Sequence, residues 1–222
     1  MNDIAKNLER IEKDLLSFKT KLLPVSKTYS VERIMEAYNY GYKAFGENRV
    51  QELLEKYEAM PKDINWHLIG HLQTNKVKFI SPFIGLIHSV DSEKLLVEID
   101  KQAAKVGRQI NCLIQVFIAT EETKFGWDID EIKNWYSNNE PTKYPNIKVV
   151  GLMGMASNSS DENLVRNEFL NLKALFEHLK QYDILPNSSM ETLSMGMSGD
   201  YKIAAEEGST LVRMGSAIFG HR

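Results

Sequence analysis

A lysine directly follows the first apolar run of the chain. Leu22 to Val25 have the pattern of a short buried strand, and Ser26 and Lys27 come next in "PVSK". Burying an ammonium group is costly, so such a lysine either extends its head group into water or is placed there to react. Burial and nearby cations raise the neutral fraction of an amine, and the neutral amine is the nucleophile that forms a Schiff base with an aldehyde.

Two stretches near the end of the chain contain residues that suit an anion. "LSMGMSGD" contains Ser194, Met195 and Gly196, and "RMGSAIFG" contains Gly215 and Ser216. Glycine lets the backbone approach a ligand closely, and serine adds a hydroxyl without bulk. Neither stretch is a Walker A loop, and no Rossmann fingerprint is present. Taken alone the residues suit ordinary turns equally well, so their meaning depends on where the fold places them.

Arg213 interrupts an apolar run. It lies between Val212 and Met214, and the alternation of a strand points Arg213 to the face opposite these two neighbours. An arginine inside a barrel needs acceptors that offset its desolvation. A structural ion pair and a ligand contact are both consistent with this pattern.

Apolar periodicity predicts eight short strands that alternate with helices, after an opening helix whose stripe is Ile4, Leu8, Ile11 and Leu15. The strands are expected at Leu22–Val25, Ala44–Phe45, Asn65–Ile69, Leu86–Val90, Ile110–Ile118, Ile147–Met153, Glu191–Ser194 and Thr210–Met214. Short helices are expected at Val31–Asn39, Glu47–Tyr57, Thr74–Ile80, Asp130–Tyr136 and Gly199–Glu206. Two longer helices have apolar stripes from Leu95 to Ala103, capped by Asp91 and ended by Gly107, and from Val165 to Leu179.

Alternating strands and helices predict a parallel sheet, and eight units in 222 residues favour a closed (β/α)8 TIM-type barrel over an open sheet. We expect one domain over residues 1–222. Functional groups of such barrels lie at the carboxyl ends of the strands, and phosphate sites commonly follow strands seven and eight. Lys27, Arg213 and the two glycine-serine stretches then share one rim, which suggests a phosphate-bearing aldehyde, namely pyridoxal 5′-phosphate.

Composition limits the class of partner and the compartment. The formal net charge is −3, so no strongly basic field attracts nucleic acid or an anionic membrane surface. No apolar run has membrane-spanning length, and the first residues are too charged for a secretory signal. The single cysteine, Cys112, lies in an apolar run and has no internal disulfide partner. These features favour a cytoplasmic protein that has no nucleic acid or membrane partner.

The sequence resembles the pyridoxal phosphate homeostasis proteins, a family of single barrels related to the N-terminal domain of alanine racemase. The motifs that carry the resemblance span nearly the whole chain. They are "PVSKTY", "FGENRVQE", "WHLIGHLQTNK", "HSVDS", "KFGW", "GLMGMA" and "LSMGMSGDYKIAAEEGSTLVRMGSAIFGHR".

The resemblance implies roles for individual residues. Lys27 in "VSK" matches the lysine that forms the internal aldimine, and Ser194, Gly215 and Ser216 match the phosphate cradle, in which the family often has threonine where Ser216 stands. Arg213 matches the arginine that faces the pyridine nitrogen. An arginine there keeps that nitrogen unprotonated and weakens the ring as an electron sink.

Further implications concern the edges of the pocket. Asn48 in "GEN" and Met195 are implied as pocket contacts. Tyr29 and Ser30 stand where many members carry a lysine and a proline, and this departure is expected to alter only the loop beyond the aldimine. The "FIATEETKFG" segment also departs from the commoner version, so no role is assigned to Lys124.

Two functions compete. The first is a non-catalytic carrier that binds pyridoxal phosphate and manages its intracellular supply, with apo forms of pyridoxal phosphate enzymes as candidate partners. The second is a racemase-like enzyme. Alanine racemases use a second, β-rich domain that supplies a tyrosine base across the dimer, whereas this sequence ends at Arg222, just after the eighth unit. Together with Arg213, this favours the carrier, and the absent dimer interface favours a monomer.

Two other chemistries are less consistent with the sequence. An aldolase-type lyase would also use a lysine at a strand end, but it does not explain the long C-terminal motif. A zinc site at His67 and His71 would suit one helix face, yet "WHLIGH" has the pattern of a strand entering a loop, and no third ligand is evident. No metal is therefore expected.

Overall fold

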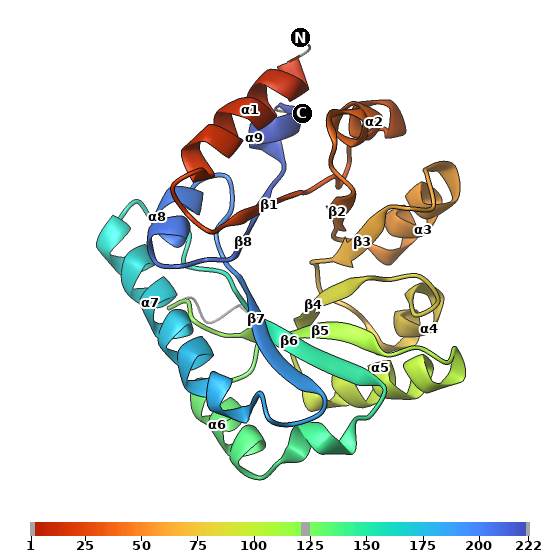
Figure 1. Ribbon diagram of the computed structural model, residues 1–222, viewed down its shortest axis with the longest axis vertical. Helices are drawn as coiled ribbons and strands as arrows, with labels where there is room; N and C mark the ends of the chain where they lie inside the picture. The colour runs from red at the N-terminus through yellow and green to blue at the C-terminus, as the bar shows by residue number, and fades with distance from the viewer. Residues whose placement is uncertain (1–2, 121–124, 221–222) are drawn as a thin grey trace.

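Eight parallel strands curve into one nearly closed barrel (Figure 1). The computed structural model describes residues 3–120 and 125–220, so Lys124 lies outside the described residues. The strands are β1 (Lys21–Pro24), β2 (Ala44–Glu47), β3 (Asn65–Leu68), β4 (Leu86–Val90), β5 (Ile110–Val116), β6 (Ile147–Gly154), β7 (Ser188–Ser194) and β8 (Leu211–Met214).

The sheet order closes the barrel. It runs β1-β8-β7-β6-β5-β4-β3-β2 with every pairing parallel, and a bridge between Val25 and Gly46 joins the ends of β1 and β2. Because the first and last strands of the order are thus also neighbours, the predicted TIM-type (β/α)8 fold is confirmed.

Helical segments follow each strand and form the outer ring seen in Figure 1. The α-helices are α1 (Asp3–Leu15), α2 (Val31–Tyr40), α3 (Val50–Ala59), α4 (Val77–Ile80), α5 (Glu93–Lys105), α6 (Ile129–Ser137), α7 (Glu162–Leu179), α8 (Tyr201–Glu206) and α9 (Ser216–Phe219). Short 3-10 helices are η1 (Thr74–Lys76), η2 (Glu140–Lys143) and η3 (Lys180–Tyr182). The expected extra helix, α1, packs against α9, where the Asn7 side-chain amide donates to the Ile218 carbonyl at 2.9 Å.

Two apolar regions hold the barrel together. The larger one lies between the sheet and the helices and contains the α1 stripe that was predicted from spacing. The smaller one consists of Leu86, Leu113, Val150 and Met153. Along β8, Val212 and Met214 join the larger region while Arg213 takes the other face, as strand alternation predicts.

Several element boundaries differ from those predicted. Glu47 belongs to β2, and α3 begins only at Val50. Ser92, not Asp91, caps α5 by accepting from the Leu95 amide, since the helix begins at Glu93; the Asp91 carboxylate is paired with His71 at 2.8 Å. Gly107 does end that helix, with a φ of 65°. The strand β7 begins three residues earlier than expected, and the helix predicted at 74–80 is divided into η1 and α4.

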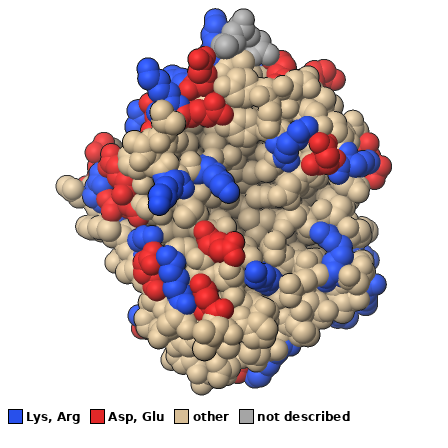
Figure 2. All heavy atoms as spheres, in the orientation of Figure 1, with Lys and Arg blue, Asp and Glu red and all other residues tan. Residues whose placement is uncertain are grey.

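Charge is mixed over the surface shown in Figure 2. Acidic and basic side chains are interspersed on this face, so it carries no large patch of one sign. In the part of the chain that the structure describes, no helix is both long and apolar enough to cross a membrane.

Candidate functional site

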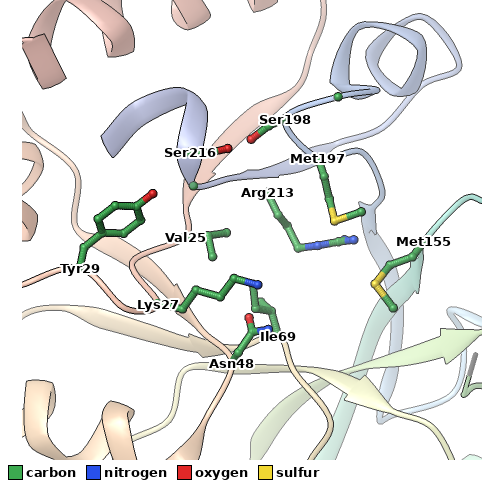
Figure 3. A pocket seen from close by; sticks show the side chains of 12 residues that line it. Val25, Lys27, Tyr29, Asn48, Ile69, Met155, Met197, Ser198, Arg213 and Ser216 are labelled. Carbon is green, nitrogen blue, oxygen red and sulfur yellow. The ribbon is translucent and has the colours of Figure 1, made fainter. Parts of the chain in front are cut away.

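One cavity of about 580 Å³ opens at the carboxyl ends of the strands (Figure 3). Its walls come from the residues that follow β1, β2, β3, β6 and β7 and from the end of β8. The lining residues are Val25, Lys27, Tyr29, Asn48, Ile69, Met155, Met197, Ser198, Gly199, Arg213, Gly215 and Ser216. The barrel therefore gathers segments that are far apart in the sequence.

Lys27 lies on the wall of this cavity. Figure 3 shows its amine directed into the cavity, on the side of Asn48 and Ile69. Two backbone hydrogen bonds hold the preceding residues: the Val25 amide donates to the Met214 carbonyl at 2.7 Å, and the Ser26 amide donates to the Gly46 carbonyl at 3.0 Å. The lysine is therefore carried by a turn that is anchored to both neighbouring strands.

Arg213 is buried at the base of the cavity with neutral acceptors. Its Nη1 donates to the carbonyl and the hydroxyl of Ser194 at 2.8 and 2.7 Å, and its Nη2 donates to the Gly154 carbonyl at 3.2 Å. No carboxylate among the described residues forms a salt bridge with it, so the structural ion pair is not what the structure shows. Burial lowers the pKa of the guanidinium to about 10, which leaves it charged at neutral pH. Two of its five N–H donors, on Nε and Nη2, have no acceptor in the described protein.

A chain of hydrogen bonds extends from Arg213 across the barrel interior. The Ser194 hydroxyl lies 3.1 Å from His88 Nδ1, and His88 Nε2 lies 3.0 Å from His67 Nδ1. Because Arg213 donates to Ser194 Oγ, the serine proton is left for His88 Nδ1, and His88 then donates from Nε2 to His67. Burial lowers the pKa of His67 to about 4, and that of His88 also lies well below its usual value. Both rings are thus neutral, as this donor order requires.

This geometry corrects the predicted role of Ser194. The side chain is fully buried, is absent from the cavity wall and has Arg213 and His88 as partners. The serine hydroxyls that do line the cavity belong to Ser198 and Ser216, and Figure 3 shows them pointing toward one another. Gly215, another predicted residue, lines the same region. The sequence reasoning missed Ser198, although "GMSGD" offered it as the first hydroxyl after the strand end.

Met195 is also corrected. It is fully buried in the layer between sheet and helices, because it follows the inward-facing Ser194 and strand alternation turns it outward. Met155 and Met197 line the cavity in its place. Met197 lies beyond Gly196, whose φ of +94° turns the chain back over the cavity.

Asn48 and Tyr29 complete the wall that is nearest to Lys27. Asn48 lines the cavity, and its Oδ1 atom is buried without a hydrogen-bond donor among the described residues. Tyr29 also lines the cavity, and its hydroxyl donates to the Gly220 carbonyl at 2.7 Å. The expectation that the change at Tyr29 affects only the loop beyond the site is therefore wrong.

The two candidate zinc ligands, His67 and His71, have different partners in the structure. His67 is buried and paired with His88, whereas His71 is half exposed and paired with Asp91. Within residues 3–120 and 125–220, no group of three or more histidine, cysteine or acidic side chains could hold a metal ion.

Comparison with known proteins identifies the family. Residues 1–222 match the model of the alanine racemase N-terminal domain. A pyridoxal phosphate homeostasis protein of Aquifex aeolicus is 44% identical over 204 residues, which cover 91% of this chain and 87% of the relative. The homologue from Haemophilus influenzae is 38% identical over 91% of this chain and 85% of the relative. This chain belongs to the pyridoxal phosphate homeostasis protein family.

Solved structures agree with that assignment. PipY of Synechococcus elongatus without pyridoxal phosphate superposes with a TM-score of 0.90 at 32% identity, covering 98% of this chain and 100% of PipY. The structure of PipY with pyridoxal phosphate bound gives a TM-score of 0.85 over the same shares. Alanine racemase of Bartonella henselae, at 18% identity and a TM-score of 0.73, shares the fold, and this chain covers 60% of it.

Proposed function

We propose that this protein binds pyridoxal 5′-phosphate in the cavity and acts in the intracellular homeostasis of that cofactor. The observation that carries the proposal is one cavity with an amine on one wall, Lys27, and a pair of hydroxyls on another, Ser198 and Ser216. PipY, which has been solved with pyridoxal phosphate bound, supports it through 32% identity over 98% of the chain.

The polar groups of the cavity fit the polar groups of the cofactor. The hydroxyls of Ser198 and Ser216 and the backbone at Gly215 suit the phosphate, which accepts hydrogen bonds. The unassigned N–H donors of Arg213 suit the lone pair of the ring nitrogen. The side-chain amide of Asn48, which lines the cavity, suits the phenolic oxygen. Each polar group of the cofactor thus has a polar counterpart on the cavity wall.

Lys27 is the covalent anchor in this proposal. When bound, pyridoxal phosphate supplies an aldehyde that condenses with an amine to a Schiff base and releases water. Lys27 is the one lysine on the cavity wall among the described residues, and its amine is directed inward. It lies on a turn whose Val25 and Ser26 amides are anchored to β8 and β2.

The proton-transfer groups of the cavity favour a carrier over an enzyme. Besides Lys27 and Arg213, the titratable side chain on the described wall is Tyr29, whose hydroxyl proton is engaged by the Gly220 carbonyl. Arg213 donates to the ring nitrogen in this proposal, and a donor that stays charged keeps that nitrogen unprotonated and the ring a weak electron sink. Holding the cofactor without turnover is the outcome that these groups support.

Binding and its anchor are tested by titrating the cofactor-free protein with pyridoxal phosphate and following the visible absorbance of the Schiff base. The parent protein and a Lys21→Ala variant, changed at an exposed lysine of β1, are expected to develop the same band. Lys27→Ala is expected to develop none. Equal bands in Lys27→Ala and the parent would exclude Lys27 as the anchor.

Turnover is tested separately with the loaded protein. A racemase-like activity, suggested by the shared fold with alanine racemase, would exchange the α-proton of alanine or serine with solvent deuterium. We expect no exchange above that of free pyridoxal phosphate. Sustained exchange at enzyme-like rates would replace the carrier by an enzyme.

The proposal extends to the setting in which the protein acts. We place residues 1–222 as a single functional unit and a monomer in the cytoplasm, with apo forms of pyridoxal phosphate enzymes as recipients. Incubating the loaded protein with an apo-enzyme in the presence of a trap for free cofactor tests direct transfer. Activation of the apo-enzyme despite the trap supports delivery, whereas no activation supports storage alone.

A further inference from the structure

A buried ion cluster lies directly behind the turn that carries Lys27. The Lys56 ammonium donates to the Glu47 carboxylate at 2.7 Å, to the Glu52 carboxylate at 2.6 Å and to the Ser26 carbonyl at 2.7 Å. These three acceptors match the three N–H donors of an ammonium group. The Ser26 hydroxyl also donates to Glu47, at 2.5 Å. The cluster is therefore built around the residue that precedes Lys27.

The same cluster also contacts the residue that follows Lys27. The Thr28 amide donates to Glu52 Oε1, the atom that also accepts from Lys56. Thr28 has a φ of +66°, a left-handed conformation that is unfavourable for a β-branched residue and persists where surrounding contacts hold it. Backbone groups on both sides of Lys27 are thus bound by charged side chains of α3, Lys56 at the Ser26 carbonyl and Glu52 at the Thr28 amide, while Glu47 of β2 accepts from the Ser26 hydroxyl.

The cost of this arrangement argues that it has a role other than stability. Lys56 is 5% exposed and Glu47 is fully buried, and burial raises the pKa of the Glu47 carboxyl although Lys56 and Ser26 oppose that shift. Replacing a buried ion pair by apolar side chains is often neutral or stabilising, so such a cluster is poor evidence for stabilisation by itself. Here the cluster binds the two peptide units that flank Lys27: Lys56 donates to the carbonyl of Ser26, and Glu52 accepts from the amide of Thr28.

We propose that Glu52 and Lys56 are positioning residues, which hold the Ser26–Thr28 turn so that the Lys27 amine faces into the cavity. The inference rests on the proposed function, in which that amine anchors the cofactor. Neither side chain lines the cavity, so both act through the backbone of the turn. A chain without this cluster would leave Thr28 free to relax toward a right-handed or extended conformation, and the lysine would then point elsewhere.

Glu52 offers the sharper mutational test. Lys56→Met would leave Glu47 a buried carboxylate without its cation, a change that strongly destabilises a fold. The Glu52 side chain, by contrast, is 22% exposed. Glu52→Ala removes the acceptor of the Thr28 amide, and Glu52→Gln restores an acceptor oxygen without the charge. Glu55→Ala makes the same change on the same helix at an exposed residue that accepts a hydrogen bond from Gln51, which makes it the matched control.

Two readouts separate positioning from general stability. The first is hydrogen exchange at the Thr28 amide of the cofactor-free protein. The second is cofactor retention, measured as the fraction of Lys27 fixed by borohydride at limiting pyridoxal phosphate. For Glu52→Ala we expect faster exchange at Thr28 and about tenfold weaker retention, the effect of one lost hydrogen bond to a charged acceptor. Glu52→Gln should recover most of the retention, and Glu55→Ala should match the parent in both.

Each outcome bears on the proposal. Retention in Glu52→Ala equal to that in Glu55→Ala would overturn it, whatever the melting temperature does. Retention that Glu52→Gln fails to recover would also overturn it, because the hydrogen bond to Thr28 would not be the cause. If instead the parent protein itself shows no cofactor fixed at Lys27, the proposed function fails, while exchange at the Thr28 amide still reports whether Glu52 holds the turn.

Discussion

At the scale of single residues, two serines that look interchangeable in the sequence have different tasks. Ser194 ends β7 inside the barrel and connects Arg213 to His88, whereas Ser198 lies four residues later on the cavity wall. Alanine variants of the two serines are therefore expected to differ. Loss of the Ser194 hydroxyl should change folding stability, and loss of the Ser198 hydroxyl should change cofactor binding.

Ser194→Ala is expected to destabilise the fold. It leaves a buried Arg213 N–H and His88 Nδ1 without their hydroxyl partner, and such losses cost about 1–3 kcal/mol each. Urea unfolding of the cofactor-free protein measures the change, with Ser198→Ala as the control at a position outside this chain of hydrogen bonds. Equal stability of the two variants would contradict the connecting role of Ser194.

Ser198→Ala and Ser216→Ala are expected to weaken cofactor binding and to leave folding stability near that of the parent. Both hydroxyls face the cavity, and each neutral hydrogen bond lost to the phosphate costs about 1 kcal/mol. Titration with pyridoxal phosphate and with pyridoxal, which lacks the phosphate, checks the assignment. The variants should lose affinity for the phosphorylated form alone; an equal loss for both forms would place the phosphate elsewhere.

At the scale of elements, the loop after β7 depends on Gly196. Its φ is +94°, and a Cβ atom there would lie 2.5 Å from the Ala204 Cβ on α8. The left-handed backbone at Gly196 turns the chain next to α8, and the residues that follow, Met197 and Ser198, line the cavity.

Gly196→Ala is therefore expected to lower the free energy of unfolding by about 2 kcal/mol or more, from the left-handed backbone and the clash together. Gly199→Ala, three residues along the same loop, is the control, because a Cβ atom there meets nothing within 4 Å. Thermal or urea unfolding of the cofactor-free proteins compares them. Similar stability of the two variants would show that the loop can adopt another low-energy backbone conformation that accepts alanine at position 196.

The elements also show what could be foreseen from the sequence. Eight apolar runs separated by helical stripes were sufficient for the barrel, and alternation around Arg213 was sufficient to place it inside. The same alternation at β7 places Ser194 inward and Met195 outward, whereas the motif resemblance implies a cofactor contact for both. Ser198 could not be placed by periodicity, since its position depends on the turn at Gly196 and on packing against α8.

For the molecule as a whole, the buried histidine pair makes the free energy of unfolding depend on pH. Burial lowers the pKa of His67 from 6.5 to about 4, so the unfolded chain takes up a proton at a higher pH than the folded chain does. The stability associated with the neutral ring is present above about pH 6.5 and is lost as the pH falls toward about 4. His88 shifts in the same direction through burial.

The expected result is a free energy of unfolding that decreases between pH 6.5 and 4, with roughly 3 kcal/mol linked to His67. Asn in place of His67 keeps an acceptor for His88 and cannot titrate. His67→Asn should therefore reduce the slope over this range, while His71→Asn, at the exposed histidine, should leave most of it. Denaturant unfolding across the range measures both, and parallel curves for parent and His67→Asn would refute the linkage.

The barrel as a whole brings residues from the two ends of the chain to one cavity, with Lys27 after the first strand and Ser216 after the last. We propose that this cavity holds pyridoxal phosphate on Lys27. Borohydride reduction of the loaded protein, followed by peptide mass mapping, tests it most directly. We expect a phosphopyridoxyl group on the peptide that contains Lys27; its location on another lysine, or its absence after loading, would show that Lys27 is not the anchor.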